Sequence, residues 1–159
     1  MIIRPYCQSD CDILKDITVR CFNSVSSIDH NIERLFGLVD GKNWEWRKKQ
    51  HIDDDIAAHP TGIFIADSEG SPIGYVTTRV NHETGIGSIP NLAVLPEFRK
   101  NSIGQALIRK AIGHLRAQGM KLVRIETLDT NTVGKNFYTS YGFKEVAMQI
   151  HYAAPLDDT

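Results

Sequence analysis

Residues 86–115 read IGSIPNLAVLPEFRKNSIGQALIRKAIGHL, and they contain the clearest structural pattern of the chain. Its first ten residues, 86–95, are mostly apolar and predict a strand, whereas the charged residues 96–101 predict a turn. From Ile103 onward, apolar residues recur about every four positions, which predicts a helix with one apolar face. The stretch therefore predicts a strand that enters a helix through a short cationic loop.

The start of the predicted helix is suited to bind an anion. Ser102 followed by Gln105 is a capping-box pattern, so we expect the helix to begin at Ile103 and the Ser102 side chain to cap it through the Gln105 N–H. The first turn of a helix has unpaired backbone N–H groups and the positive end of the helix dipole. Together with Arg99 and Lys100, these groups predict a phosphate or pyrophosphate site. In the alternative reading, the two cations only lie on a surface turn.

Composition places the chain among ordinary globular proteins. The 159 residues are 42% hydrophobic and 23% charged, which fits a single domain spanning residues 1–159. A net charge of −1 gives no reason to expect nucleic acid or a membrane surface as a partner. There is no apolar run of membrane-spanning length, and the first residues lack the apolar core of a signal peptide.

Cysteine and histidine usage points to a cytoplasmic protein without a metal. Cys7, Cys11 and Cys21 are odd in number and close together, which argues against a disulfide framework. The six histidines have no metal-ligand spacing among themselves or with the cysteines. We therefore expect reduced thiols, a cytoplasmic location and no bound metal.

The remaining segments alternate between helix and strand patterns. The pattern predicts a strand at 2–4, a helix capped by Ser9 and Asp12 that runs to Phe22, a short helix within 23–43, a helix at 44–58, hairpin arms at 63–66 and 73–80, a strand at 121–128, a helix at 132–141 and a final strand at 143–152. A strand, a helix and a strand in succession imply a right-handed parallel crossover. The fold class is therefore α+β (mixed α/β), with a central, mostly antiparallel sheet and helices on both sides.

Two segments resemble a known family. Residues 94–107, VLPEFRKNSIGQAL, are similar to the acetyl-CoA-binding motif of the GCN5-related N-acetyltransferases (the GNAT family). Residues 131–143, NTVGKNFYTSYGF, are similar to the family segment that carries an asparagine and a Phe-Tyr pair. The chain departs from the family pattern at Ser102, where glycine is preferred, and at Gly134, where alanine is usual. If the backbone at Ser102 has a positive φ, a serine there is strained.

The resemblance implies a fold and an activity. It implies a splayed sheet, in which the strand at 86–95 and the next strand are parallel and diverge to admit the cofactor. It also implies an N-acetyltransferase that uses acetyl-CoA as co-substrate, needs no metal and transfers acetyl by direct attack of a primary amine of a small molecule or peptide. The implied cofactor-binding residues are Leu92, Ala93, Val94, Arg99, Lys100, Asn101, Ser102, Ile103, Gly104, Gln105, Asn131 and Tyr138.

The resemblance also implies roles for three of these residues. The Leu92 N–H is expected to donate to the thioester oxygen, and Asn131 to contact the pantetheine arm. Tyr138 is expected to bind the cofactor sulfur and to stabilise or protonate the departing thiolate. The plainer readings are that Leu92 is core, that Asn131 is a helix N-cap and that Tyr138 is a buried aromatic.

The general base and the acceptor stay open. Glu126, near the end of the strand after the central helix, is the first candidate, and Glu83, His82 or a water relay are the alternatives. An acyl-CoA-binding or sensor module without activity is the alternative function, which Ser102 keeps open. The sequence does not identify the acceptor amine, and it leaves a homodimer open.

Overall fold

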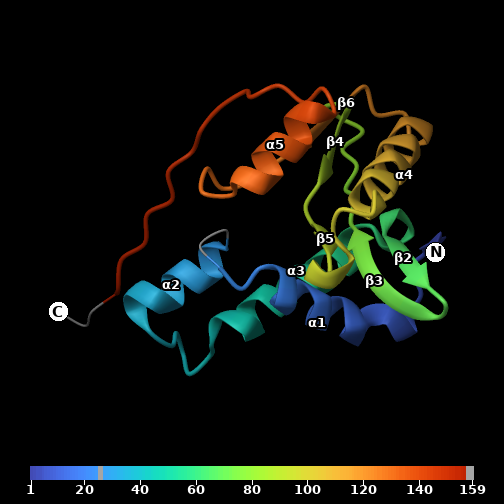
Figure 1. Cartoon of the computed structure of the whole chain (residues 1–159). Coiled ribbons are helices and arrows are strands. Elements are labelled where there is room, and N and C mark those ends of the chain that lie inside the picture. Colours follow the sequence, from blue (N-terminus) through green and yellow to red (C-terminus); the bar gives the residue numbers. More distant parts are fainter. Residues whose placement is uncertain (25–26, 157–159) are drawn as a thin grey trace. The chain divides into compact units, whose positions relative to one another are not determined.

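The computed structural model describes residues 1–24 and 27–156, which fall into two compact units (Figure 1). The first unit consists of Met1–Cys21 and Lys48–Glu126. The second unit consists of the described residues of Phe22–Arg47 and Thr127–Thr159.

An antiparallel sheet lies at the centre of the first unit. Its strands among the described residues are, in spatial order, β1 (Ile2–Pro5), β2 (Phe64–Ser68), β3 (Ser71–Val76) and β5 (Leu92–Val94). The hairpin between β2 and β3 was predicted, but β3 begins and ends earlier than the predicted arm 73–80. The residues from Phe64 to Asp67 are all buried, as in a strand that is covered on both faces.

Two helices cover opposite faces of this sheet. Tyr75 is fully buried, and its hydroxyl shares a 2.6 Å hydrogen bond with Thr18 of α1 (Cys11–Cys21). Phe64, on the opposite face of the sheet because its neighbour Ile65 pairs with Tyr75, contacts His114 of α4 (Ile103–Ala117). The predicted apolar stripe of α4 is confirmed, since its inward-facing residues Ile103, Leu107, Ile108, Ala111 and Leu115 are buried.

The predicted strand 86–95 is broken into two. β4 (Ile86–Ile89) pairs in parallel with β6 (Leu122–Ile125), whereas β5 pairs with β3. The parallel crossover through α4 was predicted and is confirmed. The break falls at Pro90 and Asn91 because proline has no N–H to donate to a neighbouring strand. The single-strand prediction for 86–95 is therefore wrong, and the break is the feature that positions the site.

The start of α1 differs from its prediction. A 3₁₀ turn (Gln8–Asp10) precedes α1, and its capping box is formed by Cys7 and Asp10, not by Ser9 and Asp12. The Asp10 carboxylate accepts from the Cys7 N–H at 2.9 Å and also pairs with Arg4. Asp10 therefore caps the turn at Cys7, and Arg4 of β1 fixes the position of its carboxylate.

The second unit contains α2 (Ile28–Phe36), the beginning of α3 (Trp44–Ala58), which continues into the first unit, and α5 (Thr132–Ser140). All three helices lie within predicted helical regions, and the bounds of α3 match their prediction. Gly37 and Gly142 follow α2 and α5 with positive φ angles of 75° and 83°. Glycine suits both positions because these angles are left-handed.

The predicted strand at 143–152 is wrong for this structure. The segment has no strand conformation, and its alternating apolar side chains Val146, Met148, Ile150 and Tyr152 are exposed. The trace after α5 in Figure 1 is accordingly irregular. Among the described residues, no helix combines the length and apolar character needed to cross a lipid bilayer.

Candidate acyl-cofactor and acceptor site

The free edge of β5 presents backbone groups to a ligand. The Thr77 N–H donates to the Asn91 carbonyl, and the Leu95 N–H donates to the Ile73 carbonyl, each at 2.9 Å. Because backbone groups alternate in direction along a strand, Leu92 and Val94 direct theirs away from β3. β5 ends the spatial order of its sheet, so these groups lie on an open edge. An extended amide-bearing arm can pair with this edge.

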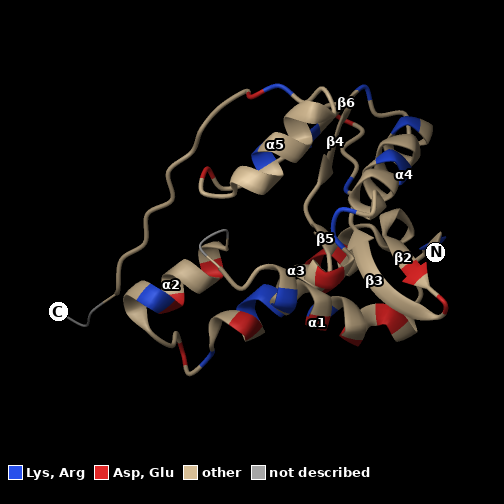
Figure 2. Cartoon of the chain, in the orientation of Figure 1, with Lys and Arg blue, Asp and Glu red and all other residues tan. Residues whose placement is uncertain are grey.

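The Val94 carbonyl on this edge is already engaged. It accepts from Arg99 Nε at 3.0 Å and from the Cys21 thiol at 3.3 Å. Burial raises the pKa of Cys21 above its ordinary value, although Arg99 opposes the shift, so the thiol keeps its proton and can donate. Arg99 therefore ties the loop after β5 back to the strand. The loop before α4 is blue in Figure 2, where Lys and Arg have that colour.

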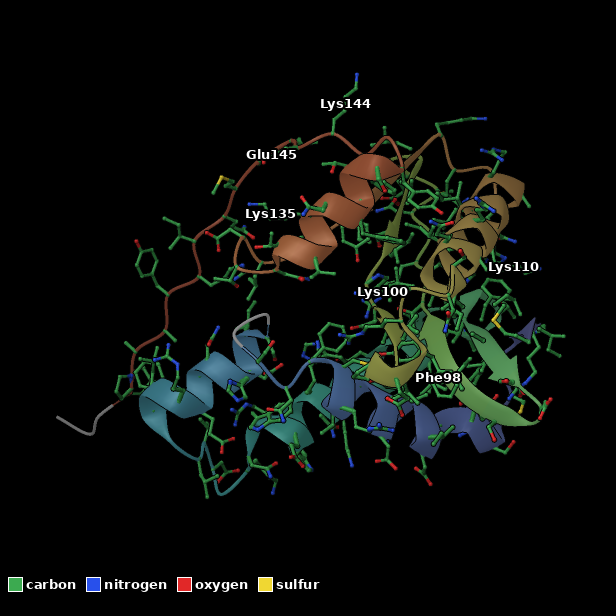
Figure 3. The ribbon with its side chains drawn as sticks, in the orientation of Figure 1. Phe98, Lys100, Lys110, Lys135, Lys144 and Glu145 are labelled. Atoms are coloured by element: carbon green, nitrogen blue, oxygen red, sulfur yellow. The ribbon has the colours of Figure 1, made fainter. Side chains whose placement is uncertain are left out.

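Left-handed backbone shapes the loop between β5 and α4. The loop begins with a 3₁₀ turn (Pro96–Phe98), and Lys100 and Ser102 then have φ angles of 68° and 59°. Neither residue is glycine, so both positions are unfavourable for the backbone. Figure 3 labels Lys100 in this loop, ahead of α4. Turns of this kind can direct successive N–H groups toward one point, which is the basis of anion-binding backbone concavities.

Ser102 occupies the N-cap position without capping through its side chain. α4 begins at Ile103, as predicted, but no side-chain hydrogen bond caps it. The expectation that Ser102 caps the Gln105 N–H is therefore wrong. At φ 59° and ψ 12° the side chain does not reach the first turn, since a capping serine needs extended backbone. The backbone N–H groups at the start of α4 thus remain available to an anion.

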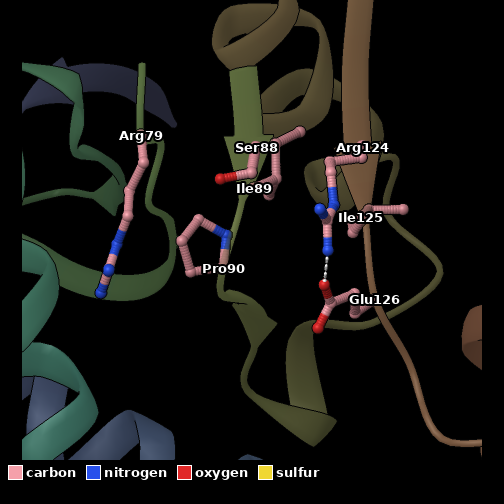
Figure 4. Close-up of a pocket in the computed structure, with 7 residues that line it drawn as sticks. All are labelled: Arg79, Ser88, Ile89, Pro90, Arg124, Ile125 and Glu126. Carbon is pink, nitrogen blue, oxygen red and sulfur yellow. Dashed lines mark hydrogen bonds and ion pairs between the residues drawn. The ribbon is translucent and has the colours of Figure 1, made fainter. Parts of the chain in front are cut away.

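The two strands of the parallel pair separate beyond Ile89 and Ile125. These two residues are the last partners in the β4–β6 register, after which β5 turns to β3. The predicted divergence of these strands is therefore present within the first unit. The opening contains a pocket of about 310 Å³, shown in Figure 4. Its lining consists of Arg79, Ser88, Ile89, Pro90, Arg124, Ile125 and Glu126.

A buried carboxylate fixes the point of separation. Asp55 of α3 is 1% exposed and accepts 2.7 Å hydrogen bonds from the Thr77 hydroxyl and the Asn91 side-chain amide. The same Thr77 hydroxyl accepts from the Asn91 N–H at 3.0 Å. Arg79 donates its Nε and one terminal nitrogen to Asp55 at 3.1 and 2.7 Å. Asp55 thus anchors both the break in the strand and one wall of the pocket.

Sequence reasoning missed Asp55 and Arg79. The available signal was the position of Asp55 between Ile52 and Ile56, which puts it on the apolar face of α3. A carboxylate on the apolar face of a helix needs a partner in the core, and this indicates a buried polar cluster. Arg79 lay inside a segment predicted as strand, and its pairing across the fold had no local signature.

The candidate bases have different surroundings. Glu126 lines the pocket and pairs with Arg124, and both side chains are exposed. Glu83 and His82 lie in the exposed turn before β4, where the Asn81 side chain accepts from the Glu83 N–H at 3.1 Å. Among the three, Glu126 is the one that lines this pocket.

Asn131 and Tyr138 belong to the second unit. Asn131 caps α5, since its side chain accepts from the Gly134 N–H at 3.1 Å. A Cβ added at Gly134 would approach Asn131 Nδ2 to 2.5 Å, which gives a reason for glycine where the family usually has alanine. The Tyr138 ring contacts Phe137 and Phe143, with centroids 5.5 and 6.0 Å away. Burial raises the pKa of Tyr138 to about 12, so its hydroxyl keeps its proton at neutral pH.

Metal ligands do not cluster in the described part of the chain, where no three His, Cys, Asp or Glu side chains are placed to hold an ion. His59 and His114 approach within 2.9 Å through their Nε2 atoms. Burial lowers the pKa of both imidazoles, and nearby cationic side chains lower it further. Both rings are therefore neutral at pH 7, and the Nε2–H of one can donate to the Nε2 of the other. This pair joins α4 to the turn before β2.

Comparisons with known proteins agree on one family. The model described as "Acetyltransferase (GNAT) family" matches residues 26–143. A mycothiol acetyltransferase from Thermobispora bispora is 30% identical over 98 residues, which are 58% of this chain and 33% of that protein. The chain thus spans about a third of the length of the mycothiol acetyltransferases that it matches. An N-alpha-acetyltransferase from Sulfurisphaera tokodaii is 26% identical, with 66% of this chain and 70% of that protein covered.

Solved structures share the fold. A PaiA N-acetyltransferase from Thermoplasma acidophilum, solved in complex with coenzyme A, has a TM-score of 0.71 and 20% identity. That comparison covers 90% of this chain and 89% of the other. At this identity the likeness establishes the fold alone.

Proposed function

Since the chain belongs to the acetyltransferase (GNAT) family, we propose that it is an acetyl-CoA-dependent N-acetyltransferase that acts on a primary amine of a small molecule or peptide. One observation carries the proposal: the free edge of β5 leads directly into the left-handed loop and the uncapped start of α4. An acyl-CoA has an extended amide-bearing arm followed by a pyrophosphate. This order matches an open strand edge followed by a helix N-terminus.

The pyrophosphate is assigned to the loop and the first turn of α4. Its oxygens accept from the N–H groups of residues 101–105, while Lys100 and Arg99 add positive charge. The pantetheine amides pair with the backbone of Leu92 and with the Val94 N–H, because these groups face away from β3 and the Val94 carbonyl is engaged by Arg99 and Cys21. The arm then reaches the pocket between β4 and β6 through the opening that follows Ile89.

The reaction is a direct displacement. The lone pair of a neutral amine attacks the thioester carbonyl and forms a C–N bond, and the carbonyl oxygen becomes an oxyanion that accepts from the Leu92 N–H. One such donor lowers the barrier of acyl transfer by about 3 kcal/mol. The C–S bond then breaks, and the sulfur leaves as a thiolate. The amine loses one proton and the thiolate gains one, so the products are the acetamide and free CoA.

Glu126 and Tyr138 are assigned to these proton movements. Glu126, in the pocket, takes the amine proton directly or through water. Tyr138 binds the developing thiolate through its hydroxyl. With its pKa raised to about 12, the phenol is a poor source of a fully transferred proton but a stable hydrogen-bond donor. Stabilising the charge on sulfur while the bond breaks is therefore its assigned role.

Release of free CoA tests the proposal. The full chain is incubated with acetyl-CoA and a broad panel of amines and peptides, and free thiol is measured over time against a reaction without acceptor. Acceptor-dependent CoA release is expected for at least one class of primary amine. Tight binding of acetyl-CoA without release over the whole panel would instead support an acyl-CoA-binding module without activity. The strained Ser102, where the family prefers glycine, is the observation that favours that second function.

A further inference from the structure

The pocket between β4 and β6 has a cation, Arg79, on one side and an ion pair, Glu126 with Arg124, on the other. In Figure 4 Arg79 lies on one side of Pro90, and Glu126 with Arg124 lies on the other. We propose that the acceptor carries a carboxylate as well as an amine, and that Arg79 binds the carboxylate while the amine reaches Glu126. This inference rests on the proposed acetyl transfer and specifies its substrate class.

Arg79 is fixed in both main chain and side chain. Its N–H and carbonyl both pair with Ser88 of β4, with hydrogen bonds of 2.9 Å. Asp55 accepts from two N–H groups on one edge of the guanidinium. A guanidinium has five N–H donors, and the described residues show no further acceptor for this one. The remaining N–H donors of Arg79 are therefore already oriented, so a ligand that binds them loses little side-chain entropy.

The exposure of the pair favours binding from solvent. The Arg79 side chain is 43% exposed, whereas Asp55 is 1% exposed. A carboxylate from outside can thus reach the outer edge of Arg79, while the inner edge stays engaged. Arginine matches a carboxylate in geometry better than lysine does, because two parallel N–H donors meet two oxygens. The site is therefore more selective than an exposed cation on a mobile chain.

On the opposite side of the pocket, Glu126 can exchange Arg124 for another cation. The side chains of Arg124 and Glu126 are 62% and 74% exposed. Ion pairs this exposed contribute little stability, so an incoming amine can replace Arg124 beside Glu126. An acceptor with both charges would find a complementary group on each side of Pro90. An amine without a carboxylate would leave the outer edge of Arg79 to water.

A matched set of acceptors tests the inference. Free amino acids and dipeptides are compared with their C-terminal carboxamides, which have the same size and lack the charge. The measured quantity is the ratio of kcat/KM for each carboxylate to that for its carboxamide, in the parent, in Arg79→Gln and in Arg116→Gln. Arg116 is an exposed cation near the end of α4 and serves as the control. Differences in amine basicity cancel because each ratio is compared between enzymes.

We expect the ratio to fall about tenfold or more in Arg79→Gln and to stay at the parent value in Arg116→Gln. An equal loss for both members of a pair would mean that Arg79 only supports Asp55, and would overturn the inference. If Arg79→Gln does not fold, Arg79→Lys keeps a cation beside Asp55 and should still lower the ratio. If CoA is released but the carboxylate-to-carboxamide ratio is the same in the parent and in both variants, this inference is contradicted and the proposed function is not. No release with any acceptor contradicts the proposed function.

Discussion

Among the described residues, Asp40, Glu69, Lys100 and Ser102 have positive φ without being glycine, and the last two lie in the proposed anion site. Lys100 and Ser102 have left-handed backbone, which costs an L-residue about 1–2 kcal/mol. The surrounding fold maintains this conformation, because Arg99 ties the loop to Val94 and α4 is anchored by its buried face. Strain of this kind is retained where it orients groups for a ligand.

Substitutions at Ser102 separate strain from capping. Because no side-chain hydrogen bond caps α4, Ser102→Ala should change the free energy of unfolding of the apo protein by less than about 0.5 kcal/mol. Ser102→Gly should raise it by up to about 1 kcal/mol, since relief of the left-handed conformation exceeds the entropy that glycine costs. Urea unfolding of the two variants and the parent measures both values. A loss of about 0.5–2 kcal/mol in Ser102→Ala would show that the side chain caps the helix after all.

The role assigned to the Tyr138 hydroxyl can be tested by a single substitution. Tyr138→Phe keeps the ring contacts with Phe137 and Phe143 and removes only the donor. We expect acetyl-CoA affinity to persist, while kcat falls by about 10²-fold. Tyr141→Phe is the matched control, because Tyr141 also contacts Phe137 and has no assigned role. Equal kcat values for the two variants would make Tyr138 a packing residue.

Among the helices and strands, apolar periodicity predicted those elements whose positions depend on residues within the same segment. The bounds of α3 and the parallel crossover follow from apolar spacing and end signals within each segment. The first residue of α4 was also predicted, but from a capping box that does not form. The break in the strand at 86–95 has a local signal in Pro90, which the apolar pattern outweighed. The contacts that hold Asn91 beyond it could not be predicted, because Asp55 and Thr77 lie far away in sequence. The alternation at 143–152 predicted a strand, but alternation does not supply an edge to pair with.

The anchoring of the first helix gives a prediction about pH. Arg4 donates to Asp10 and to Asp67 at 2.8 Å, so it holds the pKa of both carboxyl groups below the ordinary value. The stabilisation is therefore present above about pH 4 and is lost as the pH falls below that value. Asp10→Asn should lower the free energy of unfolding at neutral pH by about 1–3 kcal/mol.

Unfolding of Asp10→Asn and of the parent is measured between pH 2 and pH 7. The difference between them should shrink as the pH falls below about 4. The control Asp16→Asn removes an exposed pair with Lys49 and should stay close to the parent throughout. A difference that does not change with pH would show that the charge of Asp10 does not contribute.

In the whole molecule, one part of the proposed site is contiguous in sequence and the other part is assembled from distant segments. The proposed cofactor loop has a sequence signal because its residues are contiguous, from Leu92 to Gln105, and resemble a family motif. The proposed acceptor pocket has none, because it combines side chains from β4, from β6 and from the segment after β3. A net charge of −1 likewise conceals the local pairing of Arg79 with a buried carboxylate.

Calorimetric titration of the full chain with acetyl-CoA measures whether the proposed cofactor site binds. The parent, Arg99→Ala and Arg116→Ala are titrated at low and at high salt, so that one cation is removed from the loop before α4 and one from its last turn. We predict saturable binding to the parent and to Arg116→Ala, and about tenfold weaker binding to Arg99→Ala at low salt. The loss should be smaller at high salt because part of the affinity is electrostatic. Absence of saturable binding at millimolar acetyl-CoA, or equal affinity of the two variants, would contradict a cofactor site at the start of α4.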